Sequence, residues 1–190
     1  STFLGFGAGF LMISLVYWTF RPVAPGRTRG LFRILQVCSS AGVAFSHGSN
    51  DGQKFMGAFT LALFLGGMHQ SLEIPKWVMV LCALVMGVGT LTGGWRIVRT
   101  LGMRLTRLET HQGFAAETAA AGTILLASRF GIPLSTTHTI STAIMGVGAA
   151  RRVSAVRWGV TREIVLAWIL TFPICGVISW AVVRLIRWLF

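Results

Sequence analysis

FSHGSNDGQKFMG, residues 45–57, is the stretch that decides how this chain is organised, because it interrupts a long apolar segment with polar side chains and glycines. Its polar side chains include His47, Asn50, Asp51, Gln53 and Lys54. Asp51 is the only aspartate in the 190-residue chain. Ionisable groups inside a membrane-embedded segment usually line a pathway or pair with one another. This stretch therefore indicates a functional centre rather than a loop.

The composition around this stretch is that of a membrane protein. Hydrophobic residues make up 54% of the chain, and they gather in long runs. Soluble domains contain about 45–50% apolar residues even with glycine counted. We predict an all-α integral membrane protein, multi-pass in a lipid bilayer, with about six segments of roughly 20 residues each. The predicted segments are 3–20, 34–68, 77–95, 113–128, 133–149 and 163–183.

Two of these regions predict broken or re-entrant helices. Segment 34–68 is too long for one ordinary span, and we expect Gly48 and Gly52 to unwind it near its middle. An unwound backbone is tolerated at membrane depth only where it is buried in protein or lines a wet cavity. Segments 113–128 and 133–149 are short and joined by a turn, so they are either a pair of crossings or a re-entrant hairpin.

The net charge of +12 is concentrated between the apolar runs. Twelve of the seventeen Lys and Arg residues fall within 21–33, 96–112 and 150–162. Such clusters predict cytoplasmic loops that lie near anionic lipid headgroups, within a single membrane domain of residues 1–190. The chain has no nucleic-acid-reading motif, so the charge does not indicate a nucleic-acid partner.

The chemistry of the first cluster is that of hard oxygen ligands. The Asp51 carboxylate, the Asn50 amide oxygen and the neighbouring Ser46 suit a coupling cation such as sodium, and no zinc-type metal spacing is present. A proton carried by Asp51 is the alternative, as is a plain Asp51–Lys54 pair on an interfacial helix. His47 is either an accessory or a structural hydrogen-bonding residue. Gln53 and Lys54 either attract an anion or lie at the helix mouth.

A second cluster, GIPLSTTHTIST at residues 131–142, predicts an anion site. Gly131 and Pro133 mark a helix start, and Ser135, Thr136 and Thr137 follow at once, with His138 as an accessory. A helix N-terminus offers unpaired N–H groups and a positive dipole end. The alternative is that these hydroxyls only bond back to helix carbonyls.

Glu117 is a third membrane-embedded candidate. It lies near the start of its predicted segment, where a carboxylate favours the helix dipole. It is equally a candidate for completing a cation or proton path.

Three motifs together resemble the PiT family of inorganic phosphate transporters. They are SHGSNDGQKFMG, GFAAETAAAGTILLASRFGIPLSTTHTISTAIMGVGAARR and VRWGVTREIVLAWILTFP, within residues 34–185. The resemblance implies one half of an inverted-repeat transporter, in which each half carries an Asn-Asp and a Ser-Thr-Thr motif. It places phosphate on Ser135, Thr136 and Thr137, with Asn50 and Asp51 serving phosphate and cation.

The chain carries each motif once, where a full carrier of this family has two. We therefore expect the C-terminal half, which needs the N-terminal half of the same transporter or a half-length partner. The expected function is secondary active transport of inorganic phosphate, or of a metal–phosphate complex, with sodium or protons as coupling ion and no cofactor, in a bacterial inner membrane. The alternatives are a non-transporting membrane interaction module, a half-length relic or a sulfate permease. No nucleophile elbow is present, so an enzyme is not expected.

Overall fold

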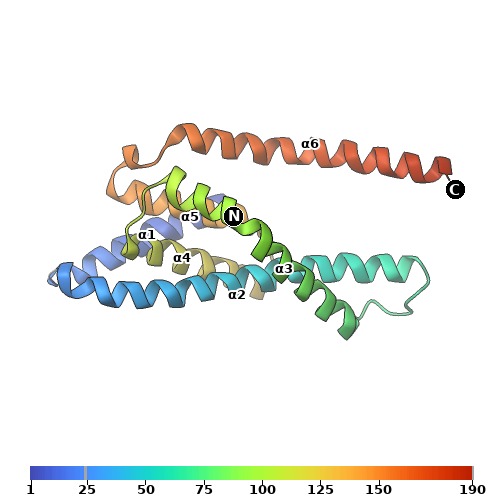
Figure 1. Ribbon diagram of the computed structural model, residues 1–190, viewed down its shortest axis with the longest axis horizontal. Coiled ribbons are helices and arrows are strands. Elements are labelled where there is room, and N and C mark those ends of the chain that lie inside the picture. The colour runs from blue at the N-terminus through green and yellow to red at the C-terminus, as the bar shows by residue number, and fades with distance from the viewer. Residues whose placement is uncertain (24, 190) are drawn as a thin grey trace. The chain divides into compact units, whose positions relative to one another are not determined.

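The computed structural model describes residues 1–23 and 25–189, and this part of the chain is helical with no β-strand. A π-helical turn, Thr100–Leu105, and a 3-10 turn, Val153–Ala155, accompany the α-helices. The predicted all-α class with six helical segments is confirmed (Figure 1). The helices are α1 (Thr2–Phe20), α2 (Pro25–Leu65), α3 (Lys76–Arg99), α4 (Thr110–Arg129), α5 (Thr136–Arg151) and α6 (Trp158–Leu189).

The helices divide into two compact units. The first runs from Ser1 to Val156 and the second, from Arg157 onward, consists of α6 with Pro173 in its interior. Among the described residues, three stretches are long and apolar enough to cross a membrane: Thr2–Phe20, Lys76–Trp95 and Trp158–Trp188. The other helices, α2, α4 and α5, carry the polar clusters that the sequence singled out.

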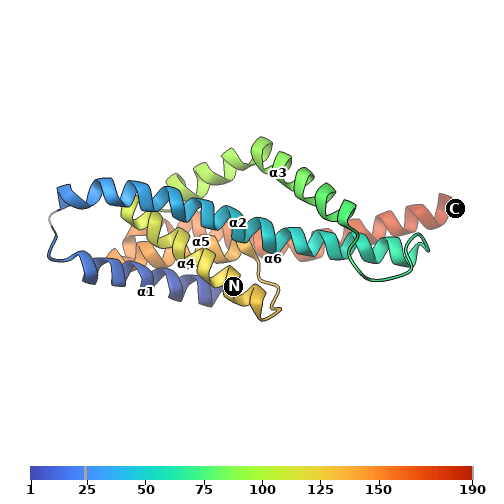
Figure 2. The ribbon, with the colours of Figure 1, turned by 90° about the horizontal axis from the view of Figure 1, so that it is seen from below.

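The core of the first unit is a layer of closely packed helices. α1 packs on α4 and α5, α2 packs on α4, and α3 contacts α2, as both views of the ribbon show (Figures 1 and 2). Small residues allow this close approach, as is usual between membrane helices. A methyl group added at Gly5 or Gly9 of α1, or at Gly146 of α5, would meet backbone atoms of the facing helix. The α1–α5 contact therefore depends on glycine.

This dependence predicts a contrast between two neighbouring glycines of α1. Gly9→Ala should destabilise the protein by about 1–3 kcal/mol, because its methyl group would overlap the Ala143 backbone. Gly7→Ala is the matched control, since nothing lies within 4 Å of a methyl group there. The thermal unfolding midpoint in detergent measures both variants. Equal midpoints for the two variants would contradict this packing.

The predicted break at Gly48 and Gly52 is wrong. α2 is one continuous helix of 41 residues, drawn without interruption in Figure 2 and about 60 Å long at 1.5 Å per residue. A glycine inside a helix costs only about 1 kcal/mol, and proline occurs only at the first position of α2. The two glycines instead line a groove between α2 and α3, together with His47, Met86 and Gly87.

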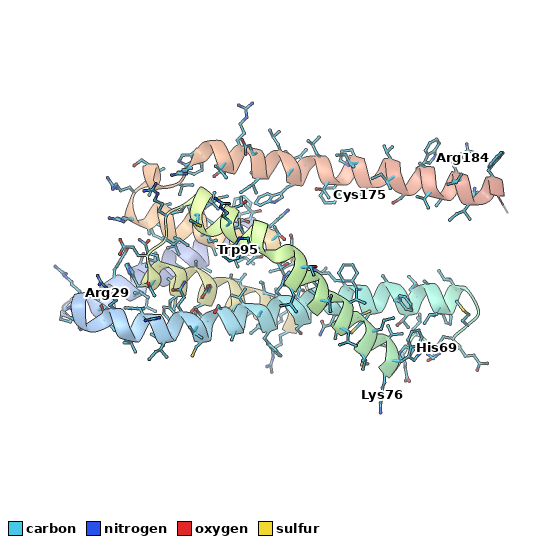
Figure 3. The ribbon with its side chains drawn as sticks, viewed as in Figure 1. Arg29, His69, Lys76, Trp95, Cys175 and Arg184 are labelled. Atoms are coloured by element: carbon cyan, nitrogen blue, oxygen red, sulfur yellow. The ribbon has the colours of Figure 1, made fainter. Side chains whose placement is uncertain are left out.

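The predicted basic loops are mostly helix ends. Residues 25–33 belong to α2, residues 96–105 to α3 and its π-helical turn, and Arg151 to α5. Arginine is a good helix former, so clustered arginines did not end these helices. Arg29 lies near the start of α2, whereas His69 and Lys76 lie beyond its other end (Figure 3). The cytoplasmic placement of the basic ends stays a prediction.

Candidate functional site

The structure brings the two polar motifs into direct contact. Thr136, in the first turn of α5, donates its hydroxyl proton to Asp51 Oδ2 of α2 at 2.9 Å. Thr136 is buried, and the Asp51 side chain is only 21% exposed. A carboxylate and a hydroxyl that are 85 residues apart in the sequence are therefore joined inside the first unit.

The start of α5 is built as the sequence predicted. Gly131 adopts a positive φ of 69° in the turn after α4, and Ser135 caps α5 by accepting the His138 N–H at 3.4 Å. The hydroxyls of Thr139 and Thr142 bond back to carbonyls four residues earlier, as the alternative interpretation expected. Thr136 differs, because its hydroxyl reaches Asp51 instead.

Beside this contact, Lys54 and Asn50 both approach the same two oxygen atoms, Asp51 Oδ1 and the Leu134 carbonyl oxygen. Lys54 Nζ lies 2.9 Å from Asp51 Oδ1 and 2.6 Å from the Leu134 carbonyl oxygen. The Asn50 amide nitrogen lies 3.3 Å and 3.0 Å from the same two atoms. The Asn50 oxygen accepts from Ser128 Oγ at 3.4 Å. The Leu134 carbonyl oxygen therefore links the segment between α4 and α5 to α2.

A single carboxylate at this site, Asp51, is contacted by two basic side chains. Asp51 Oδ2 also lies 3.3 Å from His47 Nδ1, and both His47 and Lys54 are partly exposed. Among the described residues no group of three or more His, Cys, Asp and Glu could hold a metal ion. The available ligands are carboxylate, hydroxyl and carbonyl oxygens, which suit sodium or a proton rather than zinc.

Four other candidate residues lie outside this contact network, and one of them, Thr137, is exposed in the first turn of α5. Ser46 is fully buried one turn before Asn50, and its hydroxyl donates to the Val43 carbonyl at 3.0 Å. Gln53 is exposed on α2. Glu117 of α4 instead accepts from Ser39 Oγ of α2 at 2.5 Å. Ser39 precedes Asp51 by about 18 Å of helix, so Glu117 joins α2 to α4 at a different level.

Sequence reasoning missed three partners at these contacts. Leu134 acts through its backbone carbonyl, which no side-chain pattern reveals. Ser128 and Ser39 are hydroxyls inside helices, where most such groups bond to their own backbone. Ser39 could have been found from Glu117, because a carboxylate in an apolar helix needs a hydrogen-bond donor from a facing helix.

Long apolar helices around a partly buried carboxylate and hydroxyl cluster are typical of a polytopic integral membrane protein. A family model described as "Phosphate transporter family" matches residues 18–179. The chain therefore belongs to the phosphate transporter family, and the resemblance seen in its motifs is confirmed.

Curated relatives and a solved structure agree with this assignment. A "Probable low-affinity inorganic phosphate transporter" of Rhizobium meliloti (strain 1021) is 46% identical over 177 residues, covering 93% of this chain and 53% of the relative. The protein of the same description from Bacillus subtilis (strain 168) is 37% identical over 190 residues, covering 98% and 57%. A structure named "The sodium-dependent phosphate transporter" matches with a TM-score of 0.68 and 31% identity, over 84% of this chain and 42% of that one. The chain spans about half the length of the curated relatives it matches.

Proposed function

We propose that this chain forms one half of a secondary active transporter for inorganic phosphate. Ser135, Thr136 and Thr137 would hold phosphate at the start of α5, with Asn50 and Asp51 of α2 beside them. The single observation that carries the proposal is the Thr136–Asp51 hydrogen bond, because it brings an anion-binding helix start against the chain's only aspartate.

This hydrogen bond suggests how phosphate and a cation are coupled. For Thr136 to donate to phosphate, its bond to Asp51 must open, which leaves Oδ2 without that donor. A cation that binds near Asp51, Asn50 and Ser46 would then offset the carboxylate and the incoming anion. Each ligand favours the other, which is a coupling free energy between two sites. Sodium and a proton both satisfy this role.

Asp51 also favours phosphate over sulfate, which is likewise a tetrahedral anion. Phosphate retains a proton near neutral pH and can donate a hydrogen bond to the carboxylate. Sulfate has no such proton, so its oxygens would lie against the carboxylate charge without compensation. A site that contains a carboxylate therefore selects the anion that can donate.

The complete carrier needs a second half. We propose that it is supplied by the N-terminal half of the same transporter or by a half-length partner, in a bacterial inner membrane. Access would alternate by movement of the two halves around the shared site. We do not propose a non-transporting membrane module, because the curated relatives, which are named as phosphate transporters, give it no support.

Uptake into proteoliposomes tests the proposal. The full-length protein is reconstituted into liposomes and a sodium or proton gradient is imposed. The uptake of radiolabelled phosphate is then measured. We expect uptake well above empty liposomes, with a tenfold excess of sulfate reducing it by less than about half. Absence of uptake under both gradients would reject transport. Full competition by sulfate would reject the assignment of phosphate as the substrate.

A further inference from the structure

The ammonium of Lys54 lies where a free cation would be expected to bind. Its Nζ contacts Asp51 Oδ1 at 2.9 Å and the Leu134 carbonyl oxygen at 2.6 Å. A carboxylate oxygen and a backbone carbonyl oxygen are typical ligands of hard cations. The pair comes from two places, α2 and the segment before α5, so it forms only in the folded chain.

A second cation cannot easily share this pair of oxygens. Two like charges held within about 4 Å of each other repel, and partial burial strengthens the repulsion. The amide nitrogen of Asn50 is directed at the same two oxygens and adds a second donor. A sodium ion would therefore have to displace the lysine ammonium before it could use Asp51 Oδ1.

We propose that Lys54 is a tethered cation that competes with the free coupling cation for Asp51 Oδ1 and the Leu134 carbonyl, and that it thereby sets how strongly transport depends on sodium. The inference rests on the proposed function. It assigns Lys54 a different role from that of a phosphate ligand. In this structure the ammonium is directed at two acceptor oxygens and not at the hydroxyls of α5.

The side chain is well suited to such competition. Lys54 lies one turn after Asp51, and its flexible stem is partly exposed, so it can leave the oxygens without any change in the helix. Asp51 is the acid that Lys54 contacts, and no second carboxylate contacts Lys54 among the described residues. Removing the ammonium therefore leaves the pair of oxygens open to a free cation.

Substituting Lys54 tests the inference. Lys54→Met keeps the length of the side chain and removes its charge, whereas Lys54→Arg keeps the charge. Lys76→Met is the matched control, because Lys76 is the chain's other lysine and lies exposed at the start of α3. Phosphate uptake by the protein as encoded is measured in sodium and in choline at one pH. The sodium-induced rise in the thermal unfolding midpoint of each purified variant is a second readout.

We expect Lys54→Met to raise the ratio of uptake in sodium to uptake in choline about tenfold over the native protein. Its unfolding midpoint should also rise more with sodium than that of the native protein. Lys76→Met should behave like the native protein, and Lys54→Arg should keep the native sodium dependence because it keeps the charge. If Lys54→Met does not fold, Lys54→Gln, which also lacks the charge, should give the same shifts.

Two results would overturn the inference. One is an unchanged sodium dependence in both neutral variants. The other is a loss of phosphate affinity in Lys54→Met that is the same with and without sodium, since a phosphate ligand would behave in that way. If even the native protein takes up no phosphate, the proposed function fails, and the sodium-induced midpoints still decide whether Lys54 competes with sodium.

Discussion

Replacing Asp51 by asparagine is expected to lower phosphate uptake about 100-fold, because the site loses its only formal negative charge. Asparagine keeps the shape of the side chain and can still accept the Thr136 hydroxyl proton. The loss therefore reports on charge: Lys54 is left without its carboxylate, and a free cation has no charged ligand near phosphate. The measurement is the initial rate of uptake, normalised to the amount of folded protein.

Glu73→Gln is the matched control for this prediction. Glu73 lies exposed in the connection between α2 and α3, so removing its charge should leave the rate within about twofold of native. Native rates in Asp51→Asn would show that the carboxylate has no part in transport. A rate that falls only because the variant fails to fold is recognised by its unfolding midpoint.

Thr136→Val should be the second most damaging change, with uptake lowered about tenfold to 100-fold. Valine matches threonine in shape but has no hydroxyl, so Asp51 Oδ2 loses a donor in a partly buried place. The same hydroxyl is the proposed donor to phosphate. Thr136→Ser keeps the hydroxyl and should retain most of the activity.

The control for Thr136→Val is Thr123→Val in α4. The Thr123 hydroxyl only bonds back to the Ala119 carbonyl at 2.8 Å, so its loss should change uptake little. Uptake in Thr136→Val that matches uptake in Thr136→Ser would argue that the hydroxyl has no role. The apparent affinity for phosphate should likewise be lower in Thr136→Val than in Thr136→Ser.

The sequence predicted both halves of the site because their side chains carry chemistry. Asp51 is a lone carboxylate in an apolar run, and Ser135 follows a Gly-x-Pro turn that marks a helix start. In the structure Ser135 caps α5, and Thr136 contacts Asp51 directly. The contact follows from the general cost of leaving a carboxylate unpaired away from water.

The continuity of α2 could not be predicted from its glycines. Gly48 and Gly52 have the pattern of a helix break, but their cost is small compared with the backbone hydrogen bonds that a break would leave unpaired. They line the groove beside α3 without close packing, since a methyl group added at Gly48 would meet nothing within 4 Å and one at Gly52 only the Met56 side chain of the same helix.

The sequence also did not reveal which atoms form hydrogen bonds with the candidate site residues. Lys54 reaches a main-chain carbonyl, and every residue type offers the same carbonyl. The sequence makes Glu117 a candidate for the cation path, and in the structure its hydrogen-bond donor is Ser39, at another level of α2. Helical spacing fixes which residues share a face, but it does not fix how far one helix is displaced along the next.

A double-mutant cycle between α2 and α5 tests the central claim most directly. The thermal stabilities of the native protein, Asp51→Ala, Thr136→Val and the double variant are compared. If the two side chains are hydrogen-bonded as described, the double variant should lose less stability than the sum of the single losses, by at least about 0.5 kcal/mol. Strictly additive losses would show that Asp51 and Thr136 do not touch and would contradict a shared site.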